Sequence, residues 1–204
     1  MKLTVISYPE SLTNEAQLIN RLFQHKLERF HLRKPLWEPA KVEQLIVQVE
    51  KQYHSMLIIH DHFQCAEKYG LGGIHFSAST KPQMEQWMQF PGSKSVSCHS
   101  LEEMNQLPLD MDYAFLSPVF HSISKKGYLG MQKLHEVGEF LKTYSRCKVF
   151  ALGGIDTKNI AICRKVGFDG VAVLGAIWNN DLSEKNNIEH FIKIQKVCLE
   201  SDPM

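Results

Sequence analysis

The chain has 204 residues, 44% hydrophobic and 22% charged, and this length suits one domain covering residues 1–204. Lys and Arg total 23 against 22 Asp and Glu, so the formal charge of +1 gives no electrostatic reason to expect nucleic acid or an anionic membrane as partner. The N-terminus lacks the apolar core of a signal peptide, and no apolar run approaches the roughly 20 residues that cross a bilayer. The five cysteines form no CxxC pair. We therefore expect a soluble, cytoplasmic protein with reduced thiols and a small-molecule partner.

Eight short apolar or β-branched runs follow one another along the chain and predict strands. They cover residues 3–7, 29–33, 56–60, 72–76, 94–98, 112–116, 148–152 and 170–174. The segments between them carry helical stripes of four apolar residues, such as Leu18, Ile19, Leu22 and Phe23, and Val42, Leu45, Ile46 and Val49. Strict alternation of strand and helix predicts parallel strands, and eight units predict a single (β/α)8 TIM barrel. An open doubly wound sheet is the alternative, but "ISYPES" follows the first strand in place of a Gly-rich fingerprint.

In such a barrel the active site lies where the strands end and the following loops begin. Polar and glycine residues at these positions are His31, Arg33, His60, Asp61, Ser97, His99, Ser122, Ser124, Lys125, Gly153, Gly154 and Gly175. Glycines after the seventh and eighth strands predict a phosphate site, because bare backbone N–H groups can approach an anion there. The alternative is that Gly153 and Gly154 only make a tight turn. We expect Asp156 or Thr157 to cap the helix that follows.

The stretch "HDH" at residues 60–62 fits a transition-metal site, a catalytic histidine cluster or a polar strand end. One hypothesis is a zinc-dependent barrel hydrolase that uses His60, His62 and His75. The aspartate that such hydrolases place on the last strand is missing from "VAVLGAIW".

Four stretches together are similar to the thiamine-phosphate synthase and thiazole tautomerase superfamily. They are "LIIHDHFQCAEKYGLGGIHF", "SVSCHSLEEM", "DYAFLSPVFHSISKKG" and "FALGGIDTKNIAICRKVGFDGVAVLGAIW". The resemblance implies a (β/α)8 barrel. It also implies one of two reactions: joining a pyrimidine diphosphate to a thiazole phosphate with magnesium and loss of diphosphate, or a metal-free 1,3-proton shift on a thiazole carboxylate phosphate.

On the pyrimidine diphosphate half, the resemblance assigns Arg33 to the diphosphate and Asp61 to magnesium. His60 stands where the family has asparagine, Pro35 replaces a lysine, and Thr80 replaces a second aspartate. Lys34 lies one place before the missing lysine, and we expect it to face the opposite side of the strand.

The other half of the family pattern is better preserved. The resemblance places Ser97 near the pyrimidine, and it places the thiazole phosphate on Ser122, Ser124, Lys125, Gly154, Leu174 and Gly175. Gly175 replaces a family serine, so one hydroxyl is lost there.

These uneven losses favour the tautomerase slightly, with a divergent synthase as the alternative. The resemblance then makes His99 the acid/base and His31 a second catalytic candidate at the thiazole carboxylate, with no cofactor required. A non-catalytic protein that binds thiamine phosphate is a third hypothesis. A homodimer is also possible, because barrels commonly pair through outer helices. The candidate helix holds Ile188, Phe191, Ile192 and Val197, with packing on its own barrel as the alternative.

Overall fold

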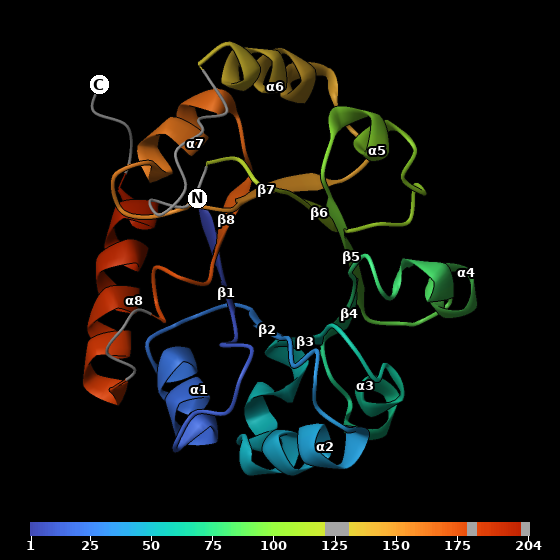
Figure 1. The fold of residues 1–204 in the computed structure, drawn as a ribbon, viewed down its shortest axis with the longest axis vertical. Coiled ribbons are helices and arrows are strands. Elements are labelled where there is room, and N and C mark those ends of the chain that lie inside the picture. Colours follow the sequence, from blue (N-terminus) through green and yellow to red (C-terminus); the bar gives the residue numbers. More distant parts are fainter. Residues whose placement is uncertain (121–130, 179–182, 201–204) are drawn as a thin grey trace.

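A computed structural model describes residues 1–120, 131–178 and 183–200, and in it eight parallel strands close into a barrel with helices outside (Figure 1). The strands are β1 Lys2–Ile6, β2 Phe30–Leu32, β3 Leu57–Ile59, β4 Gly73–Phe76, β5 Ser93–Cys98, β6 Tyr113–Leu116, β7 Lys148–Leu152 and β8 Gly170–Val173. The α-helices are α1 Glu15–Gln24, α2 Pro39–Gln48, α3 Gln64–Tyr69, α4 Met84–Trp87, α5 Leu101–Asn105, α6 Met131–Thr143, α7 Ile160–Val166 and α8 Glu184–Leu199. Two 3₁₀ helices, η1 Lys51–Met56 and η2 Lys81–Gln83, precede β3 and α4.

Pairing of β1 with β8 completes the ring, so the predicted (β/α)8 barrel is confirmed. Each of the eight predicted strands lies within two residues of its observed bounds. Closure leaves no strand edge exposed, and the two faces of every strand therefore meet different surroundings. One face packs on the helices, and the other fills the barrel interior.

The predicted helical stripes are the faces that pack on the barrel. Leu18, Ile19, Leu22 and Phe23 are buried on α1, and Val42, Leu45, Ile46 and Val49 are buried on and just after α2. Four of the five cysteines are also buried, and all five are free thiols. The apolar layer between strands and helices is thus the main core of the protein.

The last helix packs on its own barrel. Ile188 and Phe191 of α8 are buried against the core, whereas Ile192 is 41% exposed. The homodimer stays a prediction from sequence. No helix in the described ranges is long and apolar enough to cross a membrane.

The barrel interior has two unlike halves. A small apolar cluster fills the side of β1, β6, β7 and β8, made of Ile6, Tyr113, Phe115, Phe150 and Ala172. On the side of β2 to β5, histidine and serine side chains are buried instead. This division positions the two parts of the candidate site.

Candidate active site at the carboxyl end of the barrel

The turn after β7 requires both of its glycines for steric reasons. Gly153 and Gly154 have φ angles of 97° and 63°, in the left-handed region that glycine tolerates best. A Cβ on Gly153 would lie 2.8 Å from the Pro118 Cα, and one on Gly154 would lie 2.6 Å from the Phe120 carbonyl oxygen. The turn therefore packs closely on the loop after β6, as the tight-turn alternative expects.

The same turn also borders an open cavity. Residues 152–156 and 172–176, at the ends of β7 and β8, line a space of about 380 Å³. Gly175 is exposed, and a Cβ there would meet no atom within 4 Å. The N–H groups of Gly154, Gly175 and Ala176 donate no hydrogen bond to another described residue. We call this region, with its uncommitted backbone donors, the glycine side of the mouth.

A compact turn leads from the glycine side into α7. The Asp156 carboxylate accepts from the Lys158 N–H at 2.8 Å, and the Asn159 side-chain oxygen accepts from the Asp156 N–H at 3.0 Å. Asp156 was expected to cap the helix, but α7 begins only at Ile160, so its carboxylate closes the preceding turn instead. Thr157 is exposed.

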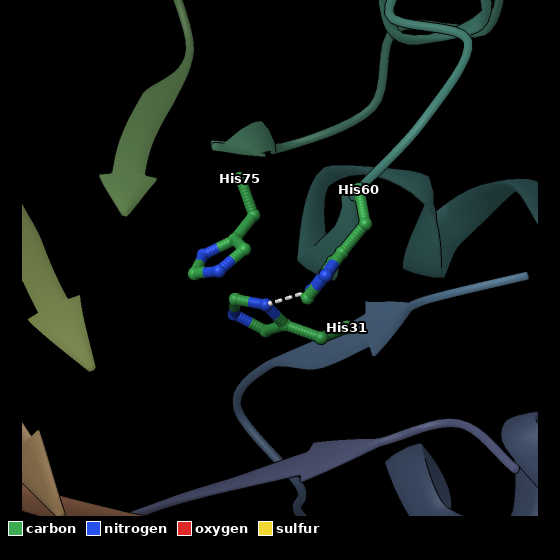
Figure 2. A group of neighbouring side chains, drawn as sticks. All are labelled: His31, His60 and His75. Atoms are coloured by element: carbon green, nitrogen blue, oxygen red, sulfur yellow. Dashed lines mark hydrogen bonds between the residues drawn. The ribbon is translucent and has the colours of Figure 1, made fainter. Parts of the chain in front are cut away.

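On the opposite side, three histidine rings meet inside the barrel, as Figure 2 shows. His31 lies on β2, His60 directly follows β3, and His75 lies on β4. Strand register explains the meeting: His31 pairs with Ile58, two residues before His60, and Ile58 pairs with Gly73, two residues before His75. Since residues two apart share a strand face, all three rings point inward. We call this region the histidine side of the mouth.

The cluster is tightly hydrogen-bonded and closed to solvent. His31 Nδ1 lies 2.8 Å from His60 Nε2, and His31 Nε2 lies 2.7 Å from the Tyr113 hydroxyl. His75 contacts the hydroxyls of Ser95 at 2.9 Å and Ser97 at 2.8 Å. His31 is fully buried, so it does not offer a free nitrogen to a ligand at the open mouth.

Burial controls the charge of these rings. Desolvation lowers the pKa of His31 and of His60 well below the ordinary histidine value, and neighbouring histidines lower both further. Desolvation, with Arg33 and Lys81 nearby, lowers the pKa of His75 to about 3. The three imidazoles are therefore neutral at physiological pH.

Arg33 and Asp61 stand above the histidines, where the barrel opens. Both are half-buried, and the Arg33 backbone is fixed by two hydrogen bonds with the Ser7 hydroxyl, at 2.8 and 2.9 Å. Burial raises the pKa of the Asp61 carboxyl, and the charges of His62 and Arg33 partly offset this rise. A cation and a carboxylate are thus available at this edge for an anionic substrate and a hard metal ion.

Lys34 does not face the mouth, in agreement with the sequence expectation, although it lies two residues after the end of β2. Its ammonium is buried and forms an ion pair with Glu15 at 2.6 Å, and it also donates to the carbonyls of Tyr8 and Glu10. Lys34 therefore anchors the loop before α1 and does not replace the lysine missing at Pro35.

Two further residues differ from sequence expectation. Thr80 is buried, and its hydroxyl accepts from the Ser77 N–H at 2.9 Å, so it closes its own turn. His62 does not share the face of His60, because the strand ends at Ile59 and His62 has a φ of 55°. Its Nε2–H donates to the Trp37 carbonyl at 2.8 Å. The hypothesis that His60, His62 and His75 form one cluster is therefore wrong for His62. His31 is the third histidine of the cluster.

His99 lies apart from the glycine side. It is exposed and lines a second cavity of about 280 Å³, between the ends of β5 and β6 and the helix α6. Its Nδ1–H donates to the Ser117 carbonyl at 2.8 Å, which fixes the tautomer and leaves Nε2 with its lone pair. Neither Gly154 nor Gly175 lines this cavity.

Comparison with known proteins decides the family. The family model described as thiamine monophosphate synthase matches residues 3–177. The chain belongs to this family. The resemblance stated from the four sequence stretches is confirmed, as is the barrel that it implies.

Relatives in the thiamine monophosphate synthase family match over different lengths. A thiamine-phosphate synthase of Oceanobacillus iheyensis is 30% identical over 126 residues, which are 61% of this chain and 61% of that one. A thiamine-phosphate synthase of Thermoplasma acidophilum is 30% identical over 146 residues, 71% of this chain and 68% of that one. The crystal structure of thiamine phosphate pyrophosphorylase from Bacteroides thetaiotaomicron has a TM-score of 0.80 and 33% identity over 97% of each chain.

The resemblance to this family implies a magnesium ion at the ends of β3 and β4, where few oxygen ligands are available. Among residues 57–64 and 73–81, Asp61 is the one carboxylate, and the Thr80 hydroxyl is used within its turn. Magnesium commonly binds through one or two carboxylates together with substrate phosphates. The donor set therefore fits an ion that a bound diphosphate helps to hold.

Sequence reasoning grouped His60 with His75 but added His62 in place of His31, and it missed Tyr113 and Ser95. The sequence did contain this information. Once the barrel is assumed, alternate residues along each strand face its interior, so the inward-facing side chains of adjacent strands can be identified. Ser122, Ser124 and Lys125, predicted to bind phosphate, lie outside the described residues.

Proposed function

We propose that the protein is a thiamine-phosphate synthase of divergent type, which joins a pyrimidine diphosphate to a thiazole phosphate and releases diphosphate. The observation that carries this proposal is the glycine-lined cavity at the ends of β7 and β8. It occurs in a chain of the thiamine monophosphate synthase family, and a thiamine phosphate pyrophosphorylase structure matches that chain over nearly its whole length.

On the glycine side, the N–H groups of Gly154 and Gly175 bind the thiazole phosphate, and Leu174 packs on the ring. Backbone donors suit a phosphate because they are fixed in direction and carry no competing counter-ion. Ser122, Ser124 and Lys125 are proposed to complete this half with two hydroxyls and a cation.

On the other side, Arg33 binds the diphosphate and Ser97 contacts the pyrimidine. Asp61 and the substrate phosphates would hold magnesium, which would supply charge neutralisation for the departing diphosphate. His60 stands where the resemblance expects an asparagine and is buried in the histidine cluster, which is why we call the synthase divergent.

The thiazole tautomerase is a second candidate, favoured by one observation at His99. A carbonyl partner holds Nδ1–H and leaves an exposed Nε2 as a proton acceptor, as a 1,3-proton shift requires. Against it, His99 and the glycine side line different cavities, and His31 is buried away from both.

Two assays with purified protein separate these proposals. Thiazole phosphate, pyrimidine diphosphate and magnesium should yield thiamine phosphate and diphosphate, with loss of activity in Asp61→Asn and Arg33→Gln. Conversion of thiazole carboxylate phosphate tautomers, abolished in His99→Gln, would support the tautomerase instead. Product in neither assay would overturn both. Tight binding of thiamine phosphate in that case would favour the non-catalytic hypothesis.

A further inference from the structure

Three buried side chains from consecutive strands gather their nitrogens in a small volume. His31, His60 and His75 each offer one ligand atom, and these atoms all lie within 4.8 Å of one another. Figure 2 shows the three rings turned toward a common region of the barrel interior. We propose that these histidines form a binding site for a first-row divalent transition metal ion, with zinc as the best-matched ion.

The ligand chemistry selects this class of ion. Neutral imidazoles suit zinc, copper, iron and nickel, whereas magnesium and calcium prefer carboxylate, carbonyl and water oxygens. Three protein ligands with a fourth position for water or a substrate atom is the arrangement of a catalytic zinc site. The site is therefore chemically distinct from the magnesium position proposed at Asp61. It shares no residue with the glycine side, so it does not rest on the proposed function.

A second observation points independently to a ligand. His60 Nδ1 is a buried polar atom without a hydrogen-bond partner among the described residues. Buried polar atoms nearly always have partners, and a bound ion is one of the groups that can satisfy such an atom. His60 itself is 3% exposed, so solvent does not supply the missing partner.

Two of the three rings already have the outer partners that metal-binding histidines use. A ligating histidine commonly donates its second N–H to an oxygen, which fixes the ring and its tautomer. His31 Nε2 lies 2.7 Å from the Tyr113 hydroxyl, and His75 Nδ1 lies 2.9 Å from the Ser95 hydroxyl. These contacts leave His31 Nδ1 and His75 Nε2 as the nitrogens that would face the ion.

Only side-chain movement is needed to convert the cluster. With metal–nitrogen bonds of about 2.0–2.1 Å, tetrahedral ligands lie about 3.4 Å apart. The His31 Nδ1–His60 Nε2 hydrogen bond of 2.8 Å would break, because the His60 ring must turn to present its unpartnered Nδ1 to the ion. His75 now stacks on His60 with ring centroids 4.1 Å apart, so its ring must rotate and release the Ser97 hydroxyl.

Nearby charges do not forbid a cation. Arg33 and Lys81 both lie close enough to His75 to lower its pKa. Lys81 is paired with Glu103 at 2.7 Å, and Arg33 interacts with the Asp61 carboxylate. Arg33 and Lys81 thus each have a negative neighbour, whereas Arg29, which lowers the pKa of His31, lies 4.4 Å above the Tyr113 ring.

The test uses cobalt(II) as a coloured substitute for zinc. Wild-type protein, freed of metal by a chelator, is titrated with cobalt until the visible absorbance is constant, because the buried site is expected to fill slowly. We expect one cobalt per chain with the intense visible bands of tetrahedral coordination, and loss of those bands when zinc is added. Elemental analysis of the untreated protein should find one transition metal per chain.

Matched variants locate the site. His60→Asn and His75→Asn should abolish stoichiometric binding, and Ser95→Ala should weaken it about 10–100-fold as an outer partner. His62→Asn is the control, because His62 lies outside the cluster and asparagine tolerates its positive φ. Absence of saturable cobalt uptake by folded wild type overturns the proposal, whatever the variants do. Bands that persist in His60→Asn, or disappear equally in His62→Asn, also overturn it.

Discussion

The two sides of the barrel mouth are built by opposite means. The histidine side, at the ends of β2 to β4, consists of side chains that are buried, neutral and bonded to one another. The glycine side, at the ends of β7 and β8, has the exposed backbone of Gly154 and Gly175 at a cavity lined otherwise mainly by apolar side chains. A backbone site depends on the conformation of the chain alone, so it can persist while the side chains opposite are exchanged. This difference offers a physical reason for the uneven losses that the sequence resemblance implies, which are fewer on the glycine side.

The largest effect that separates the two sides should come from acid. The three histidines have folded pKa values far below the unfolded value of about 6.5, so below that pH the unfolded chain binds protons that the folded chain does not. The contribution of the three neutral histidines to the free energy of unfolding is thus fully present above pH 6.5 and decreases as the pH falls toward 3. Each histidine that stays neutral contributes about 1.4 kcal/mol per pH unit. Urea unfolding from pH 7.5 to 4.5, with a chelator present, measures this loss.

A variant assigns that loss to the histidine side. His60→Asn removes one of the three neutral rings, so the slope of stability against pH should fall by about one proton. His62→Asn should leave the slope nearly unchanged, since His62 lies outside the cluster. An unchanged slope in His60→Asn would show that other groups cause the acid sensitivity.

The next largest effect should be at Lys34, which lies one place before the position of the lysine that the resemblance expects at Pro35. Lys34→Met leaves the Glu15 carboxylate buried without its partner, and we expect a loss of about 3–5 kcal/mol in the free energy of unfolding. Adding Glu15→Gln to Lys34→Met should restore part of the lost free energy of unfolding, because the double variant has no unpaired buried charge. Chemical denaturation measures both. Substrate affinity of the folded variant should stay near wild type, and a large loss of diphosphate affinity at normal stability would contradict this assignment.

Much of the fold could be predicted because it depends on local pattern. Eight apolar runs and the stripes such as Leu18 to Phe23 fix strand and helix independently of what they pack against. Two local features also agree with the sequence expectation: Lys34 does not face the mouth, and Gly153 and Gly154 make a tight turn at positive φ.

The site was harder to predict, because it depends on where neighbouring elements end. His60 and His62 appeared equivalent until the strand was seen to end at Ile59, which sends the two rings in different directions. Thr80 resembled a lost metal ligand, although its hydroxyl closes a turn. His99 was expected to act as the acid/base on a thiazole phosphate, but the Ser117 carbonyl holds it over a different cavity from the one at the glycines. These contacts join segments far apart in sequence, where periodicity carries no information.

On the glycine side, Gly154→Ala should cost about 2 kcal/mol of stability, because alanine at positive φ is strained and its Cβ would press on the Phe120 backbone. Gly175→Ala, in open space, is the matched control and should change stability by less than about 0.5 kcal/mol. Thermal or urea unfolding compares the two variants. Equal costs at both positions would contradict the difference in packing that the structure describes.

The smallest effect should be a gain of binding at Gly175, where the family has a serine. Gly175→Ser adds a hydroxyl in open space beside the cavity, so stability should stay within about 0.5 kcal/mol of wild type. One additional hydrogen bond is worth about 0.5–1.5 kcal/mol, which corresponds to roughly 2- to 12-fold tighter binding of thiazole phosphate by calorimetry. Gly175→Ala separates the hydroxyl from the added carbon, because alanine offers no donor. If serine and alanine change the affinity equally, the phosphate does not lie against this position. The glycine side would then be an open turn, and only the histidine side would carry chemistry.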